Sequence, residues 1–138
     1  VDASGDELVL LRPGAVTAED VARVLGHAVA RGAPDPHAPN APGQLASHYA
    51  PRARLRLNAS EAREGEALLA FGRAVASTGF VINLSPSGNL NEAAAHLFAS
   101  LRAFDAAGCG AVAVMSIPNQ GLGVAINDRL QRAAAPRP

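Results

Sequence analysis

A proline-rich run from Ala33 to Arg54 divides this chain and limits what can form on either side of it. The run holds half of the chain's ten prolines and lacks any apolar run or helical periodicity. Proline fixes φ, removes an amide donor and favours extended geometry in the residue before it. We therefore predict an extended linker over residues 33–53, which separates a short segment, residues 1–32, from a longer one, residues 54–138.

His48 and Tyr49 lie side by side near the end of this linker, and Tyr49 is the only tyrosine in the sequence. A passive spacer needs neither an imidazole nor an aromatic hydroxyl. The residues alone leave two interpretations open. Either the tyrosine pins the linker to its own domain, or the pair contacts a ligand.

Composition narrows the possible functions. With 49% hydrophobic and 17% charged residues, the 138-residue chain is typical of a globular protein. The formal net charge is zero, so we expect neither direct nucleic-acid binding nor attachment to an anionic membrane. All twelve basic residues are arginine, which excludes a lysine-dependent phosphate loop or a Schiff base within this chain.

Cysteine and histidine content argues against a disulfide framework or a metal site. Cys109 is the single cysteine, and the four histidines are scattered without metal-ligand spacing. No apolar run reaches transmembrane length and the first residues do not resemble a signal peptide, so we expect a cytoplasmic protein. Because the sequence begins at Val1 rather than at methionine, we also expect it to be a piece of a longer chain.

The first segment reads as one strand and one helix. Residues 7–11 form an apolar run, and Thr17 with Asp20 predicts a capping box that starts a helix ending at Gly32. One strand and one helix cannot bury a core, so this segment must pack against another domain. Arg12 lies at the strand end and is held there by the following Pro13. Its guanidinium either donates paired hydrogen bonds to a phosphate or a carboxylate, or forms one half of a surface salt bridge.

The second segment predicts a small three-layer α/β domain of Rossmann-like type with a mostly parallel sheet. An alternating edge strand is expected at 54–57, strands covered on both faces at 67–71, 80–84 and 111–117, and helices at 90–107 and 122–135. The first helix has Asn89 as its N-cap and Glu92 at N3. Its expected buried stripe comprises Ala94, Leu97, Phe98, Leu101 and Phe104.

Ligands of open α/β sheets bind beyond the carboxyl ends of the strands. The polar loop from Ser85 to Asn89 and the Gly121-Leu122-Gly123 start of the last helix occupy such ends. Both patterns are also what ordinary turns and helix caps use, and we favour that interpretation. In the same helix, Asp128 and Arg129 could form an ion pair with a neighbouring element or lie on a solvated helix face, and we favour the solvated face.

Several stretches together resemble one family, the two-domain L-threonylcarbamoyladenylate synthases. Residues 10–17 resemble the "LRPG-x-[IV]-T" turn that ends the YrdC-like catalytic domain of that family. Residues 42–51 resemble its "SPG…HY[SA]P" interdomain linker. Residues 121–130 resemble its closing "GLG-x-AI-x-DRL" helix, and residues 91–105 its helix with the "LR-x-[LF]-D" ending.

This resemblance implies that residues 1–32 end a catalytic domain, residues 33–53 are the linker and residues 54–138 are an accessory domain. The parent enzyme would make threonylcarbamoyl-AMP and pyrophosphate from L-threonine, bicarbonate and ATP, for the threonylcarbamoyladenosine modification of tRNA. Arg12 matches an arginine that helps to bind ATP, and His48 and Tyr49 match linker residues at the mouth of the site. ATP and Mg²⁺ would bind in the missing catalytic domain, so this chain alone would hold no catalytic residue, metal or cofactor and would be inactive.

The linker departs from the commoner family pattern, because Gln44, Leu45, Ala46 and Ser47 replace a stretch that holds basic residues. Phosphate contacts from these positions are therefore not expected. Two other functional classes stay open: a stand-alone α/β module that binds a nucleotide or another effector, and a docking or dimerisation domain.

Overall fold

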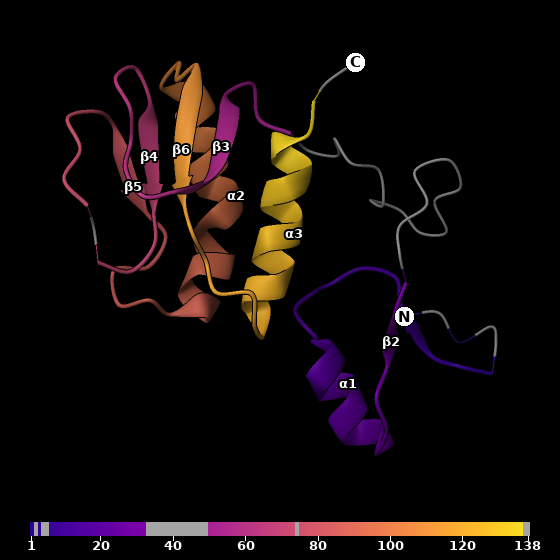
Figure 1. Cartoon of the computed structure of the whole chain (residues 1–138). Coiled ribbons are helices and arrows are strands. Elements are labelled where there is room, and N and C mark those ends of the chain that lie inside the picture. Colours follow the sequence, from indigo (N-terminus) through magenta and orange to yellow (C-terminus); the bar gives the residue numbers. More distant parts are fainter. Residues whose placement is uncertain (2, 4–5, 33–49, 74, 137–138) are drawn as a thin grey trace.

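The computed structural model describes residues 1, 3, 6–32, 50–73 and 75–136, which form two sheets and three helices (Figure 1). The strands are β1 (Val9–Leu10), β2 (Ala30–Arg31), β3 (Arg54–Ala59), β4 (Ala67–Ala70), β5 (Val81–Asn83) and β6 (Ala111–Met115). The helices are α1 (Ala18–Leu25), α2 (Leu90–Ala106) and α3 (Leu122–Ala134). All pairings are parallel: β1 pairs with β2, and the larger sheet has the order β3-β6-β4-β5.

The N-terminal unit, residues 6–32, begins its helix as predicted and ends it earlier. Thr17 and Asp20 form the reciprocal capping box, and these hydrogen bonds hold the pKa of Asp20 below its ordinary value. The prediction that this helix extends to Gly32 is wrong. It ends at Leu25, where Gly26 takes the left-handed conformation with φ of 77°, and the chain turns back to pair Ala30 and Arg31 with β1.

The strands at the centre of the larger sheet, β4 and β6, are buried on both faces as predicted. Leu68 and Leu69 of β4 are at most 1% exposed although their side chains point to opposite faces. The predicted edge position of β3 is also confirmed. The strand at 80–84 differs from the prediction, because β5 is the other edge and leaves Val81 38% exposed.

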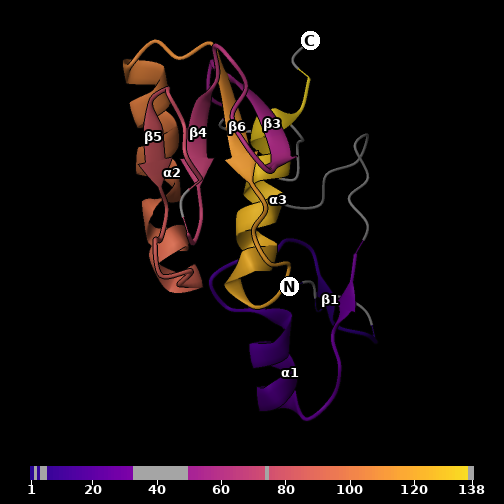
Figure 2. The same ribbon diagram turned by 60° about the vertical axis from the view of Figure 1, so that its left-hand side comes forward.

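Both helices of the larger domain pack on the same face of its sheet (Figure 2). Leu97 and Phe104 of α2 and Ile126 and Leu130 of α3 belong to one buried cluster with the inner face of the central strands. The opposite face carries a smaller cluster, against which Ala62 of the β3–β4 loop packs. The predicted α/β class and parallel sheet are confirmed, and the third layer is this loop rather than a helix.

Helix α2 keeps the predicted cap but turns a slightly different face to the sheet. The Asn89 side chain accepts hydrogen bonds from the amides of Asn91 and Glu92, as an N-cap does. Phe98 is 43% exposed, so its predicted place in the buried stripe is wrong. The residues that α2 buries are Ala93, Leu97, Ser100, Leu101 and Phe104.

Helix α3 starts where two glycines are required for different reasons. Gly121 has a φ of 52°, which strains residues that carry a Cβ. At Gly123 a Cβ would collide with the carbonyl oxygen of Pro118 in the preceding loop. The amides of Gly123 and Val124 are already bonded to Gln120 and Gly121 within the turn. The helix-start interpretation of this motif is therefore supported by the geometry.

The loop that covers the second sheet face is fastened by a bidentate ion pair. Arg56 of β3 donates from Nε and Nη2 to the two carboxylate oxygens of Glu66, at 2.9 and 2.6 Å. The amide of Arg63 donates to the same carboxylate at 2.9 Å. These hydrogen bonds, led by those of Arg56, lower the pKa of Glu66 to about 2.

We expect Glu66→Gln to destabilise the protein in a pH-dependent way. The folded-state pKa of about 2 lies below the ordinary value of 4.5, so the carboxylate stabilises the fold above pH 4.5. This contribution is lost as the pH falls through about 2. Melting temperatures measured between neutral and acid pH should therefore show a gap between wild type and variant that narrows below pH 4.5. Glu64→Gln, at an exposed position of the same loop, is the control. A pH-independent gap would contradict the assignment.

We expect Gly123→Ala to lower the free energy of unfolding by about 1–3 kcal/mol, because the added methyl group overpacks the contact with Pro118. Thermal or urea unfolding measures the change. Gly110→Ala is the matched control, since a Cβ there meets nothing within 4 Å. Equal stability of the two variants would contradict this prediction, because it would mean that the loop before α3 can move to accommodate the methyl group.

Candidate functional site

Arg12 lies between the N-terminal unit and helix α3. It follows β1 by two positions, and its Nε lies 3.8 Å from the Asp128 Oδ2 of α3. The two side chains are 29% and 22% exposed, so the pair is partly shielded and still reachable from solvent. The salt-bridge alternative for Arg12 is therefore what the structure shows, and its role as a donor to phosphate stays a prediction. The other two predicted site residues, His48 and Tyr49, lie outside the described residues.

The same oxygen of Asp128 also accepts a hydrogen bond from a second arginine. Arg132, one helical turn further along α3, donates from Nε to Asp128 Oδ2 at 3.0 Å, and it is only 8% exposed. The solvated face that the sequence analysis favoured for Asp128 is therefore wrong, and the alternative, an ion pair, is what the structure shows. The i, i+4 spacing of Asp128 and Arg132 was a signal for this pair that the sequence reasoning did not use.

A second carboxylate fixes the point where the linker enters the larger domain. Asp105 Oδ1, in the last turn of α2, accepts hydrogen bonds from the amides of Arg52 and Ala53 at 2.9 and 3.3 Å. Ala53 is 2% exposed, so this part of the backbone is held inside the domain. Sequence reasoning placed Asp105 only within a helix-ending motif and did not foresee this contact, which joins residues far apart in the chain.

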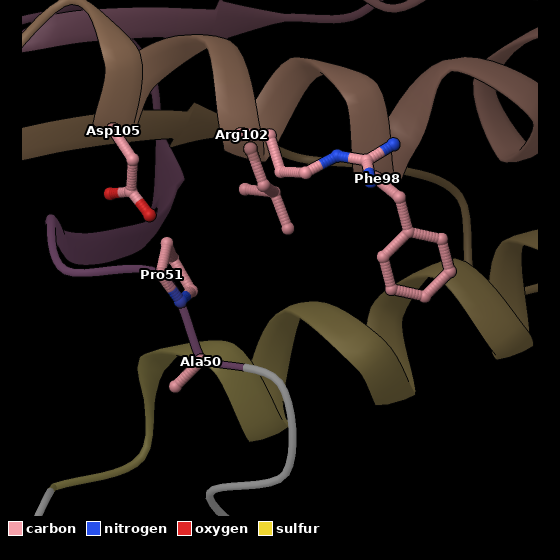
Figure 3. Close-up of a pocket in the computed structure, with 6 residues that line it drawn as sticks. Ala50, Pro51, Phe98, Arg102 and Asp105 are labelled. Atoms are coloured by element: carbon pink, nitrogen blue, oxygen red, sulfur yellow. The ribbon is translucent and has the colours of Figure 1, made fainter.

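A cavity of about 420 Å³ opens beside this anchor, between α2 and α3 (Figure 3). Phe98 points from α2 toward α3, and the Arg129 guanidinium carbon lies 5.3 Å from its ring centroid. The cavity has a mostly apolar lining, to which Arg102 and Asp105 add charged groups. Its lining residues are Ala50, Pro51, Phe98, Leu101, Arg102 and Asp105.

The polar loop at the end of β5 is occupied by its own hydrogen bonds. Ser85 Oγ donates to Glu92 at 2.6 Å and accepts from the amide of Asn89 at 2.8 Å. These contacts support the turn-and-cap interpretation of the loop over a phosphate cradle.

Across the described ranges, no three histidine, cysteine or acidic side chains gather in a way that could hold a metal ion. No described helix has the length and hydropathy that a membrane span needs.

The arrangement holds segments of the chain together. Asp128 joins the N-terminal unit to α3, and Asp105 joins the linker exit to α2. Both carboxylates lie on helices whose other faces pack on the sheet, so their positions are set by the core. The site can therefore present Arg12 and the end of the linker in a defined geometry.

Comparison with known proteins gives a consistent match. A family model described as "Threonylcarbamoyl-AMP synthase, C-terminal domain" matches residues 16–135. A threonylcarbamoyl-AMP synthase of Bacillus subtilis is 31% identical over 154 residues, which cover 99% of this chain and 44% of that protein. One from Pyrococcus abyssi is 29% identical over 148 residues, covering 94% of this chain and 43% of that protein.

A solved structure agrees. The crystal structure of a Pyrococcus abyssi relative complexed with L-threonine superposes with a TM-score of 0.73 at 25% identity, covering 91% of this chain and 42% of that chain. The chain thus spans less than half of the length of the curated relatives it matches.

Proposed function

The chain belongs to the family of threonylcarbamoyl-AMP synthase C-terminal domains, and from that premise we propose that it is the accessory region of such a synthase. The parent enzyme would condense L-threonine, bicarbonate and ATP into threonylcarbamoyl-AMP and release pyrophosphate, as a nucleotidyltransferase. Its product would supply the modification of tRNA in the cytoplasm. The observation that carries the proposal is that 99% of the chain aligns with only 44% of a curated synthase.

The N-terminal unit supports the presence of a preceding catalytic domain in the parent protein. Helix α1 buries none of its residues, and Val16 and Val24 are 64% and 85% exposed. Its two partner strands have two residues each. Apolar side chains on such a small unit need a covering surface. We assign residues 1–32 to the end of the catalytic domain, residues 33–53 to the linker and residues 54–138 to the accessory domain.

In this proposal the linker lies across the catalytic cleft and the accessory domain anchors it. The hydrogen bonds that the backbone amides of residues 52 and 53 donate to Asp105 support an anchored exit, three residues after Tyr49. Arg12 would bind ATP, and His48 and Tyr49 would contact the substrates. The described residues offer no acidic cluster for Mg²⁺, so we assign the metal and ATP to the catalytic domain and no chemical step to this chain.

The cavity beside Phe98 favours one alternative, a module with its own effector site. A small molecule that raises the melting temperature of the chain with saturable dose dependence would identify that class.

The exposed apolar residues of α1 favour a second alternative, in which this helix forms a dimerisation surface. A mass in solution that rises with protein concentration would identify it.

We expect the purified chain by itself to release no pyrophosphate from ATP in the presence of L-threonine and bicarbonate. One arginine and the linker residues cannot enclose a nucleotide or stabilise its leaving group. A coupled pyrophosphate assay measures this, with the full-length synthase as the positive control. Threonine-dependent release by the chain alone would refute the assignment of the catalytic machinery to a separate domain.

We expect the full-length synthase to depend on the linker. Tyr49→Ala and a truncation ending before Ala33 should each reduce threonine-dependent ATP turnover by about tenfold or more, which corresponds to about 1.4 kcal/mol of barrier. Tyr49→Phe separates the hydroxyl from the ring. Unchanged turnover in both the alanine variant and the truncation would mean that the linker is only a tether.

A further inference from the structure

One carboxylate oxygen joins the two parts of the molecule. Asp128 Oδ2 accepts a hydrogen bond from the Nε of Arg132 at 3.0 Å and lies 3.8 Å from the Nε of Arg12. Arg132 is 8% exposed and belongs to the same helix, so it holds the carboxylate in place relative to the larger domain. Asp128 therefore directs a fixed negative charge at the N-terminal unit.

The partly shielded setting of this pair distinguishes it from the ion pairs within the N-terminal unit. Arg12 and Asp128 are 29% and 22% exposed, whereas Arg23 and Asp20 are 73% and 41% exposed. Solvent and salt weaken an ion pair less when its groups are partly buried. Of the ion pairs between residues that the structure describes, it is also the one that links this unit to α3.

The geometry leaves Arg12 able to bind an anion while Asp128 orients it. A guanidinium carries three nitrogens in one plane, and the contact to Asp128 is made by Nε. The two terminal nitrogens form the fork that matches a phosphate. Pro13 restricts the backbone directly after Arg12, so the carboxylate acts on a side chain whose base is already constrained.

We propose that Asp128 is a positioning residue for Arg12 in the synthase: the accessory domain orients the ATP-binding arginine through helix α3, in addition to anchoring the linker. The inference rests on the proposed function, which assigns Arg12 to ATP. Asp128 touches no substrate in this scheme. Its charge limits the side-chain conformations of Arg12 and thereby lowers the entropy lost when the phosphate binds.

The test uses steady-state kinetics of the full-length synthase with ATP varied. Asp128→Asn should raise KM for ATP about three- to fivefold, the upper range for a partly exposed ion pair, with kcat changed far less. Asparagine still offers an oxygen to Arg132, and melting temperatures verify folding. Asp128→Glu keeps the charge and should recover most of the affinity. Glu64→Gln, an exposed carboxylate of the same domain, is the control and should leave KM unchanged.

A double-mutant cycle decides whether Asp128 acts through Arg12. In an Arg12→Ala background, Asp128→Asn should have no further effect on KM for ATP. Two outcomes would overturn this inference and leave the proposed function standing. One is an equal effect of Asp128→Asn on KM for ATP in both backgrounds. The other is an Asp128→Asn variant with unchanged KM for ATP, while Arg12→Ala raises that KM. An unchanged KM in Arg12→Ala would instead overturn the assignment of Arg12 to ATP, and the inference with it.

Discussion

Burial of two central strands on both faces is the constraint on which the rest of this structure depends. Strands β4 and β6 carry apolar side chains above and below the sheet, so each face needs a cover. Helices α2 and α3 cover one face together. The β3–β4 loop covers the other, where the Arg56–Glu66 pair fastens it. Placing both helices on one face brings their outer surfaces side by side, and those surfaces carry the groups that hold the rest of the chain.

The two carboxylates that make these attachments differ in the kind of interaction they form. Asp105 accepts hydrogen bonds from two backbone amides, one of them in a buried residue. Hydrogen bonds to a charged group contribute about 1.5–3 kcal/mol each. Asp128 reaches Arg12 by a longer, partly exposed ion pair, a class worth about 1 kcal/mol or less. Of these two contacts, the one at Asp105 is thus the stronger.

Because the sequence has no lysine, the ion pairs between described residues are all made by arginine guanidinium groups, as is the contact with the Phe98 ring. Arg56 uses two nitrogens on one carboxylate, Arg129 lies over the Phe98 ring, and Arg132 is nearly buried while it bonds to Asp128. A planar guanidinium with several donors supports all three arrangements, whereas an ammonium acts as a strongly hydrated point charge. The same property lets Arg12 contact Asp128 through Nε while its two terminal nitrogens lie in the same plane, which is the geometry that the proposed phosphate contact would use.

The sequence by itself determined the local elements. The Thr17–Asp20 capping box, the Asn89 cap and the apolar strands predicted at 67–71 and 111–117, which form β4 and β6, depend on residues close together in the chain. Its motifs also indicated the family. Only the tertiary structure decided the strand order, the loop as third layer, the pairing of β2, the exposure of Phe98 and the partners of Asp105 and Asp128. The roles of His48 and Tyr49 stay predictions. The division follows from range: caps and periodicity act within a few residues, whereas faces and partners are set by packing between distant segments.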